Sequence, residues 1–104
     1  MRRVVVTGVG AVSPCGLETG STWSAIKEGK SGIAPITHFD ATEFATKIAG
    51  ECKGFEPEKY FERKRVREGD TFIHFAMGAS VQAINDAGFA PNDELKERTG
   101  TFIG

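Results

Sequence analysis

The sequence has few cysteines, almost no net charge and no long apolar run. Its two cysteines cannot make a disulfide framework and are typical of a protein from a reducing cytoplasm. Thirteen basic residues nearly cancel fourteen acidic ones, so no overall field favours nucleic acid or a membrane surface. No stretch approaches the ~20 apolar residues of a membrane span. We therefore expect a cytoplasmic chain without a nucleic-acid or membrane partner. Its 104 residues allow one domain or part of one.

The opening segment carries the strongest local pattern. Residues 4–6 are three consecutive valines, and a continuous β-branched run predicts a strand buried on both faces of an α/β sheet. Gly8 and Gly10 follow, and glycine lets such a strand turn or pass close to its neighbours. Arg2 and Arg3 precede the run as in an export signal, but the run is too short and too interrupted for that role.

A strand, a glycine loop and a helix also suggest dinucleotide binding, but here the match is poor. Ser13 stands where the third glycine of G-x-G-x-x-G belongs. The next helix is expected from Ser21 or Thr22 to Gly29, and this start is too late for a pyrophosphate bound at the glycines. We therefore expect no nicotinamide cofactor.

The middle of the chain combines irregular and helical patterns. Residues 30–55 read as a long irregular connection studded with apolar side chains, which indicates a segment laid over a larger body. Pro57 suits the first turn of a short helix. Asp70 is expected to cap a long helix over about residues 71–87, which Gly88 ends. This helix is apolar nearly all round, so it is predicted to be buried.

The end of the chain reads as a solvated stretch over residues 94–98 and then a second strand over residues 99–104. An ordinary domain does not end inside a buried strand. We therefore expect a partial domain, residues 1–104, that is truncated in mid-strand at its C-terminus.

An ordered series of short motifs runs through the whole chain: VVVTGVGAVSPCG, Ser21-Thr22-Trp23, Lys30-Ser31-Gly32-Ile33, His38-Phe39-Asp40, Ile48-Ala49-Gly50, Lys53-Gly54-Phe55, Arg63-Lys64, Arg67, Asp70-x-Phe72-Ile73 and Asp86-Ala87-Gly88. In this order the motifs resemble the N-terminal end of the β-ketoacyl-acyl-carrier-protein synthases, closest to the type II elongating enzyme of fatty-acid synthesis.

The resemblance implies an α/β fold of the thiolase-like type, with two similar halves packed into five αβαβα layers. This chain would be an N-terminal fragment of it. The implied reaction is decarboxylative condensation of an acyl group with malonyl-carrier protein. The enzyme would be a homodimer, and the reaction would need no metal or redox cofactor. Phosphopantetheine would arrive on the acyl carrier protein, which is the implied partner.

The resemblance places no catalytic residue in these 104 residues. The family's nucleophilic cysteine and two histidines would lie beyond Gly104, so the chain alone is expected to be inactive. Cys15 and Cys52 are interpreted as packed thiols. His74 is interpreted as a structural histidine, and His38 with Asp40 is one pair of side chains rather than a metal site.

The functional candidate within the chain is a basic run of four cations in five residues, formed by Arg63, Lys64, Arg65 and Arg67. Such a cluster steers and orients an acidic partner. The resemblance implies docking of the acyl carrier protein, with Lys64 and Arg67 at matching basic positions. Glu68 departs from the pattern, because a basic residue is usual there, and Arg65 stands where an acidic residue is common. The alternative is a solvated charge run at a helix N-terminus.

Two other functions stay open. One is a polyketide-type ketosynthase or chain-length factor, which residues beyond Gly104 would distinguish. The other is a non-catalytic carrier-protein-binding fragment. Carrier binding that falls with salt and with Lys64→Glu or Arg67→Glu would support docking.

Overall fold

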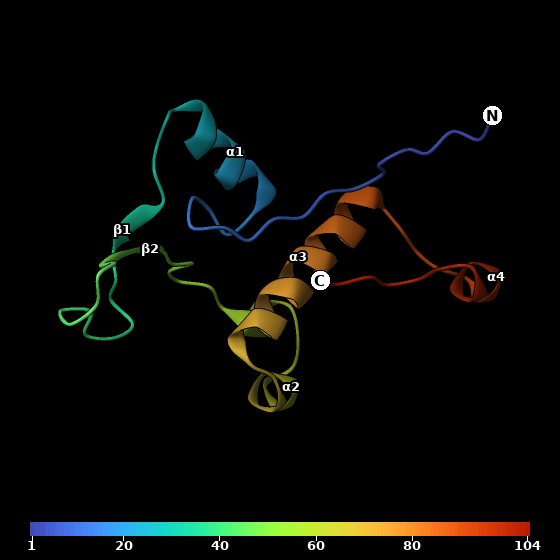
Figure 1. The fold of residues 1–104 in the computed structure, drawn as a ribbon. Helices are drawn as coiled ribbons and strands as arrows, with labels where there is room; N and C mark the ends of the chain where they lie inside the picture. The colour runs from blue at the N-terminus through green and yellow to red at the C-terminus, as the bar shows by residue number, and fades with distance from the viewer.

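The computed structural model describes all of residues 1–104 and is organised around one long helix (Figure 1). The elements are α1 Thr19–Lys27, β1 Ile33–Pro35, β2 Ile48–Gly50, the 3₁₀ helix η1 Pro57–Lys59, α2 Arg63–Glu68, α3 Thr71–Ala87 and α4 Asp93–Glu97. The N-terminal segment crosses α3 near its C-terminal end, and α2 lies below its N-terminal end (Figure 1).

The ends of α3 confirm the prediction made from local signals. The Asp70 carboxylate accepts a hydrogen bond from the Thr71 backbone N–H at 2.7 Å, and Gly88 follows the helix with φ at 61°. Pro57 begins η1 as expected. Gly29 has φ at 70° just beyond α1, which also agrees with the prediction.

Helix α1 begins earlier than the sequence indicated. Its N-cap is Glu18, so neither Ser21 nor Thr22 has that role. The Ser21 hydroxyl accepts from the Glu18 N–H at 3.2 Å and donates to the Glu18 carbonyl oxygen at 3.0 Å. These two hydrogen bonds stabilise the first turn of α1, so the helix begins at Thr19 and not after Ser21 or Thr22.

The two predicted strands at the ends of the chain are absent, so that prediction was wrong for these residues. No strand includes residues 4–6 or 99–104, and within these segments Val4 is 95% exposed and Phe102 94% exposed. A strand exists only through its ladder of hydrogen bonds to a neighbour, and neither segment has one beside it.

The connection from residue 30 to residue 55 is more regular than predicted. Strands β1 and β2 pair antiparallel, with Ala34 opposite Ala49. The loop between them is closed by the Lys47 ammonium group, which donates to the carbonyl oxygen of Thr42 at 2.6 Å and of Phe44 at 3.0 Å. Most of the predicted solvated stretch, residues 94–98, belongs to the short helix α4, Asp93–Glu97, whose first turn is capped by the Asn92 side chain. That side chain accepts a hydrogen bond from the Leu95 N–H at 2.9 Å.

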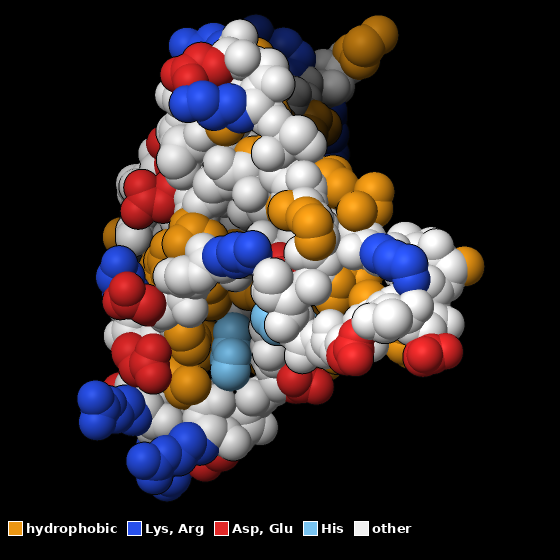
Figure 2. All heavy atoms as spheres, turned by 90° about the vertical axis from the view of Figure 1, so that its left-hand side faces the viewer, with side chains coloured by type: hydrophobic (Ala, Val, Ile, Leu, Met, Phe, Trp, Pro, Cys, Tyr) orange, Lys and Arg blue, Asp and Glu red, His pale blue; other side chains and the backbone are white.

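Many large apolar side chains are exposed, and apolar patches are visible on the face of the molecule in Figure 2. Gly78 is the only buried residue, so the prediction of a buried α3 was wrong for these 104 residues. The accessible surface is 8675 Å², whereas a globular protein of this mass exposes about 5,700 Å². The radius of gyration is 16.9 Å, against about 13 Å for a compact chain of this length. The reason is that no second layer of structure covers α3.

The helices are also too short or too polar to cross a membrane.

Candidate functional site

The predicted basic run forms a helix of its own, α2, which bears four cations and one carboxylate. At about 100° per residue, Arg63, Arg67 and Lys64 lie within an arc of about 100° on one side of the helix. Arg65 lies about 100° beyond Lys64, so the structure separates it from the other three cations. Val66 points away from this arc and is half-buried.

The four cations of α2 are free of partners within the chain. Their side chains are exposed, and basic side chains gather at the end of the molecule where α2 lies (Figure 2). None of them belongs to an ion pair, since the pairs of the structure are Lys30–Glu28, His38–Glu51, Lys59–Glu56 and Lys96–Asp93. Their charge is therefore available to a partner molecule.

The run begins a helix of its own, α2, while the long helix α3 has its own cap at Asp70. Arg63 and Lys64 occupy the first turn of α2, where no acidic residue lies. The alternative of a solvated charge run at a helix N-terminus therefore stays open. A cation there opposes the helix dipole, at a cost of about 0.3–1 kcal/mol at low ionic strength. The chain carries this cost without any internal ion pair that offsets it.

Helix α2 is held against α3 by His74. Its ring nitrogen Nε2 lies 2.9 Å from the Val66 carbonyl oxygen, and its ring centroid is 5.7 Å from that of Phe61. Gly69 leaves room for this contact, because a Cβ atom at position 69 would lie 3.3 Å from His74 Nε2. His74 thus has the structural role that the sequence predicted.

A groove of about 240 Å³ between α2 and α3 was not predicted. The residues that line it are Phe61, Arg65, Glu68, Gly69, Ile73, His74 and Met77. Its floor is mainly apolar, and the charged side chains of Arg65 and Glu68 come from α2. The sequence carried no signal for it, because the groove depends on the angle at which the two helices meet.

Neither cysteine has the surroundings of a nucleophile. Cys52 is half-buried, and this burial raises the pKa of its thiol and so disfavours the thiolate. The Cys15 sulfur lies 3.9 Å from the Lys30 carbonyl oxygen, which is an acceptor and does not stabilise a negative charge. Both observations agree with the interpretation of the two cysteines as packed thiols.

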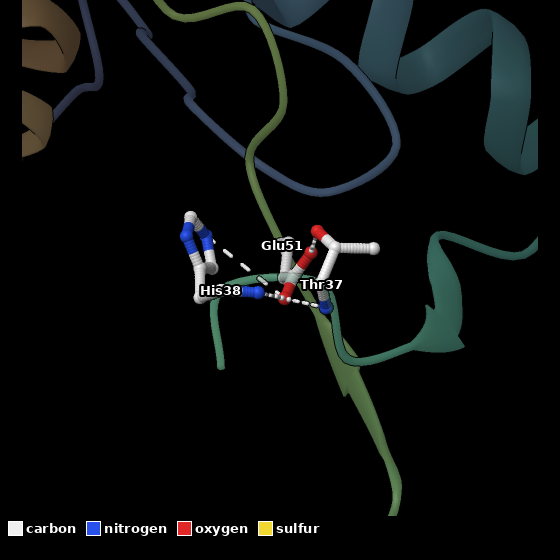
Figure 3. Close-up of polar contacts among 3 residues, drawn as sticks. All are labelled: Thr37, His38 and Glu51. Carbon is white, nitrogen blue, oxygen red and sulfur yellow. Dashed lines mark hydrogen bonds and ion pairs between the residues drawn. The ribbon is translucent and has the colours of Figure 1, made fainter. Parts of the chain in front are cut away.

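Glu51 organises a second polar cluster, with Thr37 and His38 (Figure 3). Its carboxylate accepts from the Thr37 N–H at 2.9 Å, the Thr37 hydroxyl at 2.6 Å and the His38 N–H at 3.3 Å. These bonds, led by the Thr37 hydroxyl, lower the pKa of Glu51 to about 2. His38 Nε2 is 3.9 Å from the same carboxylate, and the Glu51 side chain is 7% exposed. The cluster ties β2 to the loop after β1.

His38 therefore lies beside Glu51 and not beside Asp40. The Asp40 carboxylate accepts a hydrogen bond from the Thr42 N–H at 3.0 Å. No three His, Cys, Asp or Glu side chains of the chain come together as potential metal ligands.

Comparison with known proteins identifies the family. The β-ketoacyl synthase N-terminal domain matches residues 1–104. The 3-oxoacyl-[acyl-carrier-protein] synthase 2 of Vibrio cholerae is 47% identical over 103 residues, which are 99% of this chain and 25% of that protein. The protein of the same name from Synechocystis is 44% identical over the same shares. The chain belongs to the β-ketoacyl synthase N-terminal domain family, and it spans about a quarter of the length of these relatives.

A solved structure agrees with this assignment. The ishigamide ketosynthase/chain length factor superposes with a TM-score of 0.77 at 32% identity, over 86% of this chain and 22% of that one. The match confirms the predicted fold class, α/β of the thiolase-like ketosynthase type. Within the present chain the only sheet is the β1–β2 pair.

Proposed function

We propose that these residues are the N-terminal part of a 3-oxoacyl-[acyl-carrier-protein] synthase that elongates fatty acids. In the proposed reaction an acyl group held as an enzyme thioester is transferred to malonyl-carrier protein. A carbon–carbon bond forms to the malonyl α-carbon, carbon dioxide leaves, the thioester bond to the enzyme breaks, and 3-oxoacyl-carrier protein is released. The observation that carries the proposal is 47% identity across 99% of the chain to a protein of that name.

The contribution of this segment is to bind the carrier protein and not to perform the chemistry. The catalytic cysteine and histidines would come from residues outside these 104, and Cys15 and Cys52 do not have that role. Lys64, Arg67 and Arg63 would form the docking surface, with Arg65 beside the groove. The support is that all four cations are exposed and lack intramolecular ion pairs.

The remaining features of the proposal follow from the family resemblance. The substrate is carried on the phosphopantetheine of the acyl carrier protein, and no metal or redox cofactor takes part. The complete enzyme would act as a homodimer in the cytoplasm. Its partners would include neither nucleic acid nor a membrane.

One observation favours a second candidate. The similarity to the ishigamide ketosynthase/chain length factor allows the parent protein to be a polyketide-type ketosynthase or a chain-length factor. A chain-length factor that lacks the cysteine would form no acyl-enzyme, and a polyketide-type ketosynthase would repeat the condensation. The intact mass of the complete protein after incubation with acyl- and malonyl-carrier protein shows whether an acyl-enzyme forms. The mass of the carrier-bound product shows whether one or several two-carbon units were added.

The decisive experiment uses the complete polypeptide to which these residues belong. We expect 3-oxoacyl-carrier protein by mass spectrometry, and no product from the isolated 104-residue chain. Lys64→Ala and Arg67→Ala should each raise KM for the carrier protein roughly tenfold at low salt, with little effect on kcat, because they weaken encounter and not chemistry. Lys96→Ala on α4 is the control, since that lysine is exposed but lies outside α2. Absence of product from the complete protein contradicts the proposed activity.

A further inference from the structure

The outward side of α2 does not carry charge of a single sign. Glu68 follows Lys64 by one helical turn and lies about 40° from it around the helix axis, with Arg65 about 60° away on the other side. The carboxylate is therefore flanked by two cations. It is exposed, and it forms no ion pair in the structure.

We propose that Glu68 is a specificity-determining residue that selects a carrier protein with a basic side chain among its acidic ones. This inference rests on the proposed function, because it assigns a selective contact to the same docking surface. The partner is thus recognised by a pattern of charge, with acidic side chains opposite Arg63, Lys64 and Arg67 and one cation opposite Glu68.

The physical reason is the cost of bringing like charges together. A uniformly acidic surface seated on the three cations brings an anion toward the Glu68 carboxylate, and that contact is repulsive. A cation at the same place turns the repulsion into attraction. A single contact of reversed sign also defines how the partner is rotated on the helix, since only one orientation satisfies all the charges.

The groove makes this contact more selective. Arg65 and Glu68 both line it, beside the apolar side chains of Phe61, Ile73 and Met77. A partner that covers the groove displaces water from the neighbourhood of the carboxylate, and electrostatic interactions are stronger where water is excluded. The same exclusion penalises a partner that leaves Glu68 unpaired.

The test compares two carrier probes on the complete synthase. The first probe is an acyl carrier protein whose docking surface has only acidic charged residues. The second is a set of single acidic-to-lysine variants of that carrier, taken one position at a time. Dissociation constants are measured by calorimetry at 50 mM salt for the wild type, Glu68→Gln, Glu68→Lys and the exposed control Glu97→Lys on α4.

We expect the wild type to bind at least one lysine variant about three- to fivefold more tightly than the uniformly acidic carrier. Glu68→Lys should reverse the preference, Glu68→Gln should abolish it, and Glu97→Lys should leave it unchanged. The preference should disappear at 1 M salt, where the screening length falls to about 3 Å.

Three results distinguish a failure of the proposed role of Glu68 from a failure of the proposed docking surface. If Lys64→Ala weakens both carriers while Glu68→Lys changes neither, the selective role of Glu68 is overturned and the docking surface stands. If Lys64→Ala and Arg67→Ala change nothing, the docking surface itself is wrong. If Glu68→Lys lowers the thermal midpoint of the synthase and leaves carrier preference intact, Glu68 is a structural residue and the inference is again overturned.

Discussion

Gly10 lies so close to Ala79 that a Cβ atom at position 10 would overlap the Ala79 carbonyl oxygen. The N-terminal segment is thus pressed directly onto the backbone of α3. Two of its amides are also held by α3 side chains: Val9 N–H donates to the Asp86 carboxylate at 2.9 Å, and Ala11 N–H donates to the Gln82 side chain at 3.2 Å. Amides two residues apart in an extended chain match side chains one turn apart on a helix, because both spacings are about 6–7 Å.

The Gly10→Ala substitution should destabilise the complete protein by about 1–3 kcal/mol, because the added methyl group meets backbone that cannot move aside. The control is Gly20→Ala in α1, where no atom lies within 4 Å of the new Cβ. It should stabilise by up to about 1 kcal/mol through helix propensity. Chemical denaturation measures both, and equal stability of the two variants would contradict the close contact.

The Glu51 cluster predicts a specific dependence of stability on pH. The folded-state pKa of Glu51, about 2, lies below the ordinary value of 4.5, so the carboxylate favours the folded state above pH 4.5. This contribution is lost as the pH falls from about 4.5 to about 2. We therefore expect the difference in unfolding free energy between the wild type and Glu51→Gln to shrink across that window.

Denaturation curves of the complete protein at several pH values measure this difference. Glu94→Gln on α4 is the matched control, since that residue is exposed and lies outside the cluster. A difference between the wild type and Glu51→Gln that stays constant from pH 5 to pH 2 would show that the hydrogen bonds do not lower the pKa of Glu51.

Cys52 should react slowly with iodoacetamide at pH 8 in the folded protein. Burial raises the pKa of its thiol, and the thiolate is the reactive form. Unfolding in urea should bring its rate to that of a free cysteine in a peptide. Mass spectrometry of tryptic peptides separates Cys52 from Cys15. If Cys52 is labelled faster in the folded protein than in urea, its thiol is activated and the interpretation as a packed thiol is wrong.

The isolated 104-residue chain should lack a cooperative unfolding transition. Only one residue is buried, and such a chain has too little buried apolar surface to offset its conformational entropy. We expect binding of a fluorescent apolar dye and a weak near-ultraviolet circular dichroism signal. A sharp thermal transition in the purified chain would refute this, and would require a self-association that covers the apolar faces.

Local signals predicted the two ends of α3 correctly, although they missed the Glu18 cap of α1 and the short helix α4. Asp70 and Gly88 bound α3 as expected, because a cap and a left-handed glycine act within one turn of the helix. The four cations of α2 are visible in the sequence as a dense basic run, and their role in docking stays a prediction. Their arrangement around α2 was not predicted, because no separate helix was assigned to the run.

Features that depend on distant residues were missed. The pairing of β1 with β2 and the Glu51 cluster join residues about fifteen positions apart, and no local sequence pattern predicts either of them. The valine run has the composition of a strand, yet it forms none here. The valine side chains favour an extended backbone, but a strand also needs the ladder of backbone hydrogen bonds that only a neighbouring strand provides.

The sequence by itself determined the family of this protein, the two ends of α3 and the charge of its candidate docking helix, because each of these is a property of local order along the chain. Only the tertiary structure decided which side of α2 faces outward, which side chains line the groove beside it and how closely the first segment lies on α3. Those relationships depend on contacts between segments up to 77 residues apart, and such contacts form when packing brings the segments together.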